Sequence, residues 1–192
     1  AATTQAYRSF GRFWQASAPA TIRRLLRPHH PFSAIARAVM RAIDLAANTP
    51  RACNRQSWFT YHIDDRAVIE KALSFQTGNQ GFGHEVPYLI IISADLRAFD
   101  NANERNQHFI DGGMYSMALV MALHALGLQS CCLNWSKLVR DDRAIRKHLP
   151  IKNEHTIIMM LAVGCANESI KVGNVPVSVE TLKWAALPAL SR

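Results

Sequence analysis

The segment from Phe109 to Leu126 constrains the fold most, because its sequence predicts a helix that is apolar on most of its sides. Such a helix is buried in the centre of a domain or in an interface between chains. Gly112 and Gly113 near its start let another part of the backbone approach closely, and Gly127 ends it. Its main apolar positions are Ile110, Met114, Met117, Leu119, Val120, Met121, Leu123 and Leu126.

Shorter helical and strand-like segments alternate around this helix. Apolar periodicity predicts helices at 33–48, 66–75 and 141–148 and strands at 59–63, 86–94, 128–133 and 156–163. The chain has 192 residues, of which 49% are hydrophobic and 19% charged. This order and composition predict one globular domain, α/β or α+β, with a mixed sheet flanked by helices. We place the domain at residues 32–192, after an atypical basic segment at residues 1–31.

The positive charge of the chain is concentrated in its first third. The net charge is +8, and residues 1–60 contain nine arginines, no lysine and one acid. A phosphate-bearing ligand or another polyanion, an N-terminal presequence, and a solvated basic face without function each explain this excess. No nucleic-acid-binding motif accompanies it. No apolar run reaches the roughly 18 residues that a membrane span needs.

Cysteine and histidine spacing favours neither disulfides nor a metal site. No cysteines form a Cys-x-x-Cys pair, and the N-terminal segment lacks the continuous apolar core of a secretory signal. We therefore expect a reducing cytoplasm. His29 and His30 lack a third ligand, and a polar helix start better explains Glu104, His108 and Asp111. The four cysteines are Cys53, Cys131, Cys132 and Cys165.

The segment from Thr49 to Trp58 carries more functional groups than a helix–strand connection requires. Asn54 and Gln56 offer donors and acceptors for the edge of a flat heterocycle such as a flavin. The alternative is that these amides satisfy nearby backbone groups and that Trp58 is a core residue. A nucleophilic Cys53 paired with a histidine is a further possibility, but no local pattern supports one pairing.

Other segments fit a flavin as well. The backbone from Leu133 to Ser136 leaves a strand beside the glycine-bounded helix, which places it to approach a flat ring. The early arginines are suited to hold a phosphate. The glycine-rich stretch at residues 76–83 is either a flap over a substrate or a plain linker, because it lacks the lysine of a phosphate-binding loop.

Together these motifs resemble the nitroreductase family of FMN-dependent oxidoreductases, over about residues 38–178. The segment from Thr49 to Trp58 is similar to the Pro-Ser-x-x-Asn-x-Gln-Pro-Trp element of that family. The remaining motifs follow in the order of a branch that is often encoded beside polysaccharide-biosynthesis genes. They are Gly78–Gly83, Glu104–Gln107, Ile110–Gly113, Leu123–Leu128 and Leu133–Trp135.

The resemblance implies an α+β fold and an intertwined homodimer, with the helix from Phe109 to Leu126 as dimer core and two FMN sites at the interface, each built from both chains. It also implies that NAD(P)H reduces the flavin and that a nitroaromatic or quinone-like acceptor then takes the electrons in a ping-pong cycle. Phe82 would lie on the substrate side, and neither nucleic acid nor a membrane is a partner. The implied cofactor-binding residues are Arg23, Arg24, Arg27, Cys53, Asn54, Arg55, Gln56, Leu133, Asn134, Trp135 and Ser136.

The sequence departs from the family pattern around the phosphate. Leu25 stands where the family's Arg-x-Ser-x-Arg has its serine, and Arg51 replaces the serine of Pro-Ser. Ser57 replaces the second proline, and Glu180 occupies the position of a C-terminal arginine, where its carboxylate repels a phosphate. Two alternatives to an enzyme follow. One is a non-catalytic dimer of the same fold that binds FMN weakly or not at all, and the other is a polyanion-binding module that uses the N-terminal arginines.

Overall fold

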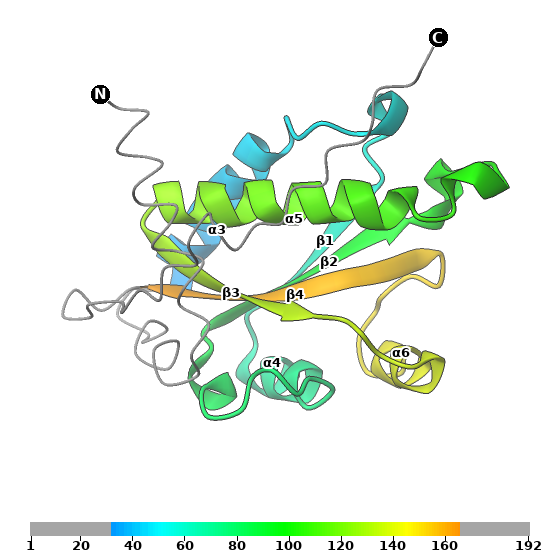
Figure 1. Cartoon of the computed structure of the whole chain (residues 1–192). Helices are drawn as coiled ribbons and strands as arrows, with labels where there is room; N and C mark the ends of the chain where they lie inside the picture. The colour runs from blue at the N-terminus through cyan, green and yellow to red at the C-terminus, as the bar shows by residue number, and fades with distance from the viewer. Residues whose placement is uncertain (1–31, 166–192) are drawn as a thin grey trace, which may run out of the picture. The chain divides into compact units, whose positions relative to one another are not determined.

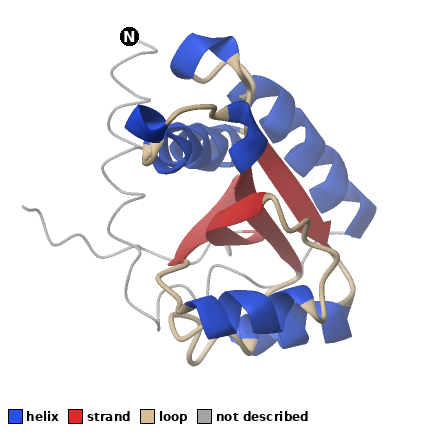
Figure 2. Cartoon of the chain, turned by 90° about the vertical axis from the view of Figure 1, so that its right-hand side faces the viewer, coloured by secondary structure: helices blue, strands red, loops and turns tan. Residues whose placement is uncertain are grey.

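The computed structural model of the chain describes residues 32–165. These residues form a sheet that is covered by helices on both faces, as Figures 1 and 2 show. α3 (Phe32–Ala46) and α5 (Gln107–Ala125) lie on one face, and α4 (Arg66–Leu73) and α6 (Val139–Arg146) lie on the other. Arg23, Arg24, Arg27, Leu25 and Glu180 fall outside the described residues, so the domain boundary and the phosphate-binding arginines stay predictions.

The sheet has four strands in the order β1-β2-β4-β3, and every neighbouring pair is antiparallel. The α+β class is confirmed, but the expectation of a mixed sheet is wrong for the described strands. The strands β2 and β3, which α5 connects, do run in the same direction. They do not pair with each other, because β4 lies between them and is antiparallel to both. The strands are β1 (Trp58–Ile63), β2 (Tyr88–Asp95), β3 (Leu128–Asn134) and β4 (His155–Cys165).

The central strands β2 and β4 are the most deeply buried part of the molecule. Four consecutive residues of β2, Leu89 to Ile92, have no exposed surface. Leu89 and Ile91 join the core cluster on the α4 and α6 face, where Ile69 and Ile145 pack against them. Burying a side chain of this size stabilises the fold by about 1.5–3 kcal/mol. The unbroken apolar runs at these two strands therefore follow from helices covering both faces.

Helix α5 has apolar side chains on two sides, as its sequence predicts. One side is buried against the sheet and α3, with Tyr115, Leu119 and Leu123 almost fully covered. Gly112 makes this packing possible, because a Cβ on it would lie 2.7 Å from Cγ1 of Ile158 in β4. The helix ends where predicted, since Gly127 has a φ of 81°. Exposed apolar side chains on the outer part of α5 are Phe109, Ile110, Met114 and Met121.

All the helices and strands expected from residue 33 to residue 163 are present, with shifts of a few residues at their ends. Periodicity did not reveal the short 3-10 helices, because one turn is too short to show a period. Among the residues described, no helix combines the length and the apolar character needed to cross a membrane. The 3-10 helices are η1 (Ala52–Asn54), η2 (Gly83–Glu85), η3 (Leu96–Ala98) and η4 (Ala102–Glu104).

Candidate functional site

The loop between α3 and β1 has an unusual backbone. Cys53, Asn54 and Gln56 have φ angles of 49°, 58° and 52°, whereas Arg55 between them is right-handed with a φ of −73°. The left-handed region is uncommon for residues other than glycine, asparagine and aspartate, and strained residues of this kind cluster at functional sites. The side chains of Cys53, Asn54 and Gln56 are all exposed. The loop thus presents its two amides to the outside of the chain.

A buried carboxylate on α5 holds this loop. The backbone N–H of Ala52 donates to Asp111 at 3.1 Å from Oδ2 and 3.4 Å from Oδ1. Gln107, one turn earlier on the helix, donates its Nε2 to Oδ1 of Asp111 at 2.8 Å. Asp111 has no exposed surface. Because water does not reach it, these hydrogen bonds are what make its burial tolerable. The first turns of α5 therefore hold Ala52, the residue that precedes the left-handed turn, in place.

Arg51, which stands where the Pro-Ser element has its serine, caps the C-terminal end of α3. One of its guanidinium nitrogens donates to the carbonyl oxygens of Ala47 at 2.8 Å and Thr49 at 2.9 Å. The guanidinium also lies 5.4 Å from the centre of the Trp58 ring, which stacks on Tyr115 at 4.7 Å. Arginine is suited to this place, because the last carbonyls of a helix lack partners within the helix.

Arg55 is bound within the chain as well. Its guanidinium lies 2.7 Å from the carboxylate of Glu104 and donates to the carbonyl oxygen of Ala98 at 3.1 Å. The hydrogen bond with Glu104 raises the pKa of Arg55. Arg55 thus ties the loop to the segment from η3 to η4. The sequence motif implied a cofactor contact for Arg55, because a local motif does not reveal a partner 49 residues away.

Two buried polar atoms beside the loop have no hydrogen-bond partner among the residues described. They are Nε of Arg51 and Oγ of Ser57, which is 4% exposed. Buried polar groups are nearly always paired in folded proteins, and exceptions require an explanation such as a missing ion, water or ligand. These atoms therefore support a functional role for the loop.

The second predicted segment lies at the end of β3. The side chain of Leu133 is 3% exposed and belongs to the core, so only its backbone is available to a ligand. Asn134 is exposed and donates to Oγ of Ser136 at 3.1 Å, and Nε1 of Trp135 donates to Asp142 at 3.2 Å. Within the described part of the chain, the backbone N–H groups of Trp135 and Ser136 have no hydrogen-bond partner. Among the residues described, both N–H groups are therefore available to donate to a ligand.

The fold places these two segments at the same end of the sheet but at opposite edges. β1 begins at Trp58, opposite Ala94 near the end of β2, and β3 ends at Asn134, opposite Met159 in the first half of β4. Three strand spacings separate β1 from β3, which is about 14 Å. A single copy of the chain therefore does not bring its two predicted half-sites together.

Phe82 is placed differently from the expectation. It is fully buried in the core cluster on the α4 and α6 face and has no surface with which to contact a substrate. Phe82 belongs to a glycine-rich loop, but burying its large aromatic side chain is more favourable than exposing it to water. Two other residues of this loop pack against the domain. Gln76 is only 8% exposed, and Gly78 lies close to the Leu133 side chain.

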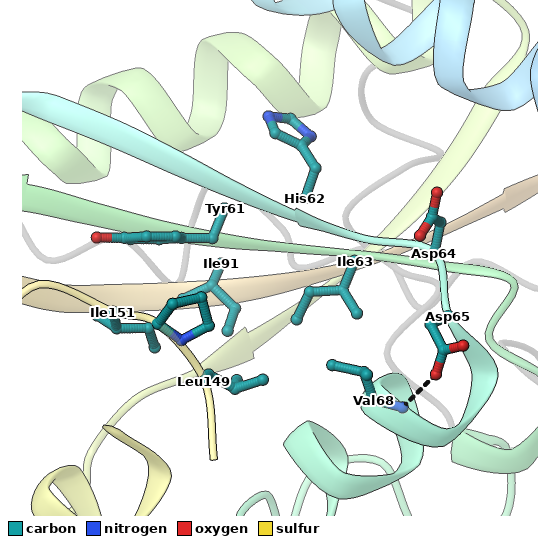
Figure 3. Close-up of a pocket in the computed structure, with 10 residues that line it drawn as sticks. Tyr61, His62, Ile63, Asp64, Asp65, Val68, Ile91, Leu149 and Ile151 are labelled. Carbon is teal, nitrogen blue, oxygen red and sulfur yellow. Dashed lines mark hydrogen bonds between the residues drawn. The ribbon is translucent and has the colours of Figure 1, made fainter. Parts of the chain in front are cut away.

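A separate pocket opens beside β1, near the end of the strand that is away from the left-handed loop (Figure 3). Its volume is about 280 Å³, and Ile63, Ile91 and Leu149 contribute to an apolar lining. Two of its polar groups, Asp65 and Tyr61, have partners within the chain. Asp65 caps α4 by accepting from the N–H of Val68 at 2.9 Å, and the hydroxyl of Tyr61 lies 2.8 Å from Nδ1 of His155. We therefore do not assign the function to this pocket.

No group of three His, Cys, Asp or Glu side chains is arranged to hold a metal ion among residues 32–165. The two acidic residues that sequence spacing raised as metal ligands have other partners here. Glu104 is paired with Arg55, and Asp111 accepts from Ala52 and Gln107.

Comparison with known proteins identifies the family. The model of the nitroreductase family matches residues 68–165, just over half of the chain. No curated protein matches. A nitroreductase-like protein from Streptococcus mutans is 16% identical, with 95% of this chain and all of that chain covered and a TM-score of 0.70. An FMN-dependent nitroreductase from Clostridium difficile is 18% identical, with 86% and 94% covered and a TM-score of 0.66.

A nitroreductase family protein from Streptococcus pneumoniae has the same fold, at 16% identity and a TM-score of 0.63, with 78% of this chain and 89% of that chain covered. At these identities the structural likeness supports the fold alone, and the family model supplies the membership. The four-stranded antiparallel sheet with helices on both faces agrees with both. The chain belongs to the nitroreductase family and is an oxidoreductase of that family.

Proposed function

We propose that this chain is an FMN-dependent NAD(P)H oxidoreductase that acts as a homodimer. The observation that carries the proposal is the pair of half-sites at one end of the sheet. One is the left-handed loop with exposed Asn54 and Gln56, and the other is the pair of N–H groups of Trp135 and Ser136, which have no partner among residues 32–165. A flavin ring requires hydrogen-bond partners along its polar edge and around its reactive nitrogen. The two half-sites offer amide groups and backbone donors that fit these needs.

FMN, when bound, supplies the redox chemistry by accepting a hydride from NAD(P)H and passing electrons to a second substrate in a ping-pong cycle. Asn54 and Gln56 would bind the polar edge of the ring and set its orientation. The backbone N–H groups of Trp135 and Ser136 would donate hydrogen bonds to the ring from its other side. Cys53 would contact the ring through its exposed position in the loop. We assign the phosphate to Arg23, Arg24 and Arg27, because Arg51 and Arg55 are engaged within the chain.

A second copy of the chain would complete each site. The outer side of α5 exposes Phe109 and Ile110, each 52% accessible, and α3 adds Met40 and Leu45. Apolar side chains gathered on two neighbouring helices are typical of an interface between subunits. In a two-fold dimer the same surfaces pair with each other, so the loop of one chain can meet the β3 end of its partner. This arrangement accounts for the distance between the half-sites within one chain.

The acceptor we propose is a flat nitroaromatic or quinone-like molecule, in line with the family. We place the enzyme in the cytoplasm, with neither nucleic acid nor a membrane as partner. The free state of all four cysteines fits a reducing compartment.

The visible absorption spectrum of the purified protein tests this proposal. We expect the two absorption bands of bound flavin, or their appearance on addition of FMN, together with NAD(P)H-dependent bleaching and a dimer in size-exclusion chromatography with light scattering. A colourless protein that takes up no FMN refutes the proposal. A dimer without FMN would support the second candidate, a non-catalytic relative, which the internal engagement of Arg51 and Arg55 favours.

A further inference from the structure

One buried side chain from another loop holds the end of β3. Gln76 follows α4, and its Nε2 donates to the carbonyl oxygen of Asn134 at 2.5 Å. Its Oε1 accepts from the backbone N–H of Thr77 at 3.1 Å. Because both ends of the amide group have a partner, the side chain is fixed in one orientation. Gln76 is only 8% exposed, so water competes little for these bonds.

This contact sets the direction of one peptide plane. The peptide between Asn134 and Trp135 is trans, so its carbonyl and its N–H point in opposite directions. With the carbonyl turned toward Gln76, the N–H of Trp135 points away from the loop that carries Gln76. That N–H is one of the free donors among the described residues. The Trp135 side chain is held separately, by its bond to Asp142 and its packing against the core.

We propose that Gln76 is a positioning residue, which holds the Asn134–Trp135 peptide so that the N–H of Trp135 is presented to the bound flavin. That a flavin accepts this hydrogen bond rests on the function proposed above, whereas the Gln76–Asn134 contact is independent of that function. Without the Gln76 donor, the peptide is free to rotate, and the Asn134 carbonyl loses its buried partner. A donor that is oriented before binding increases affinity because less ordering remains to be done.

Two substitutions test this role. Gln76→Glu keeps the shape and the oxygen that accepts from Thr77, but a carboxylate has no proton to donate to Asn134. Gln76→Met removes donor and acceptor at nearly constant length. The control is Gln129→Glu, the same change at the far end of β3, where the side chain is partly exposed. Urea unfolding of each variant confirms that the comparison is between folded proteins, and Gln76→Glu remains available if Gln76→Met does not fold.

The readouts are the NMR resonances of the peptide and the dissociation constant of FMN. In the FMN-free protein, we expect the Asn134 carbonyl carbon and the Trp135 amide to shift in both Gln76 variants and not in Gln129→Glu. Adding FMN should shift the Trp135 amide of the wild type. Both Gln76 variants should bind FMN about 3- to 10-fold more weakly, the loss expected for one hydrogen bond.

The outcomes are distinguishable. Unchanged Asn134 and Trp135 resonances in both Gln76 variants overturn the positioning role, whatever FMN does. Shifted resonances with unchanged FMN affinity overturn the link to the flavin and leave the proposed function intact. A wild-type protein that binds no FMN overturns the proposed function, and the flavin-facing part of this inference with it.

Discussion

Asn54 shows at the scale of one residue how backbone and side chain contribute separately to the site. Its φ of 58° suits asparagine or glycine, and its amide is exposed. We expect Asn54→Ala and Asn54→Gly both to bind FMN roughly 10-fold more weakly, because both lose the amide. Only Asn54→Ala should also lose stability, by about 1 kcal/mol, since alanine disfavours this backbone. FMN titration and urea unfolding measure the two effects, and unchanged FMN binding by Asn54→Gly would exclude Asn54 from the site.

Asp111 is the residue on which the loop depends. Asp111→Leu leaves the N–H of Ala52 and the amide of Gln107 without their acceptor, which we expect to destabilise the fold by about 2 kcal/mol and to weaken FMN binding. Asp111→Asn keeps one acceptor oxygen and should lose less. Ser116→Ala is the control, because within the described part of the chain the Ser116 hydroxyl donates to the Gly112 carbonyl on the same helix, at 2.6 Å, and makes no hydrogen bond to the loop. Equal urea midpoints for Asp111→Leu and Ser116→Ala would contradict the anchoring role.

At the scale of elements, the packing of α5 on β4 depends on one glycine of an adjacent pair. Gly112→Ala would bring a Cβ to 2.7 Å from Ile158, which we expect to cost about 1–3 kcal/mol in unfolding free energy. Gly113→Ala meets no atom within 4 Å and should stabilise α5 by up to about 1 kcal/mol through helix propensity. Ile158→Ala should reduce the cost of Gly112→Ala in the double variant. Equal destabilisation by the two alanines would show that the close approach is not the cause.

The sheet end where β4 begins makes stability depend on pH. Burial lowers the pKa of His155, and the neighbouring Asp95 offsets this only in part. The unfolded chain therefore binds more protons below about pH 6.5, and stability falls as the pH falls. The hydrogen bond from Arg97 lowers the pKa of Asp95 from 3.8 to about 2, so its contribution is lost as the pH falls from about 4 toward 2.

Urea midpoints measured from pH 8 to pH 2.5 should be constant above pH 7 and fall in two steps. His155→Gln should reduce the first step and leave the second. A first step of unchanged size in this variant would assign it to other groups, such as His62 and His108, whose pKa values burial also lowers.

At the scale of the whole molecule, the two half-sites and the exposed side of α5 lead to one prediction. Ile110→Lys changes a side chain that is 52% exposed in one chain but buried in the proposed dimer. We expect a monomer that retains its helical signal in circular dichroism and loses FMN, because burying an unpaired charge in the interface is costly. Val68→Lys, on α4 at the opposite face, is the control and should remain a dimer. Dimeric Ile110→Lys with normal FMN content would place the interface elsewhere.

The sequence by itself determined the elements of this protein and the motifs that name its family. Apolar periodicity, glycine at the end of α5 and the amides of Asn54 and Gln56 are local features, and a local pattern needs no knowledge of distant partners. The spacing of these motifs was enough to indicate the nitroreductase family. It was not enough to show the sheet order, because the alternation of strands and helices is the same whether or not β4 lies between β2 and β3.

Only the tertiary structure decided which of the candidate residues are available to a ligand. Arg55 pairs with Glu104, Phe82 enters the core, and Ala52 binds Asp111 across 59 residues of sequence. The left-handed loop and the orientation of the Asn134 carbonyl likewise arise from contacts between distant segments. The physical reason is that hydrogen bonds and burial depend on positions in space, which the fold sets and the residue type alone does not.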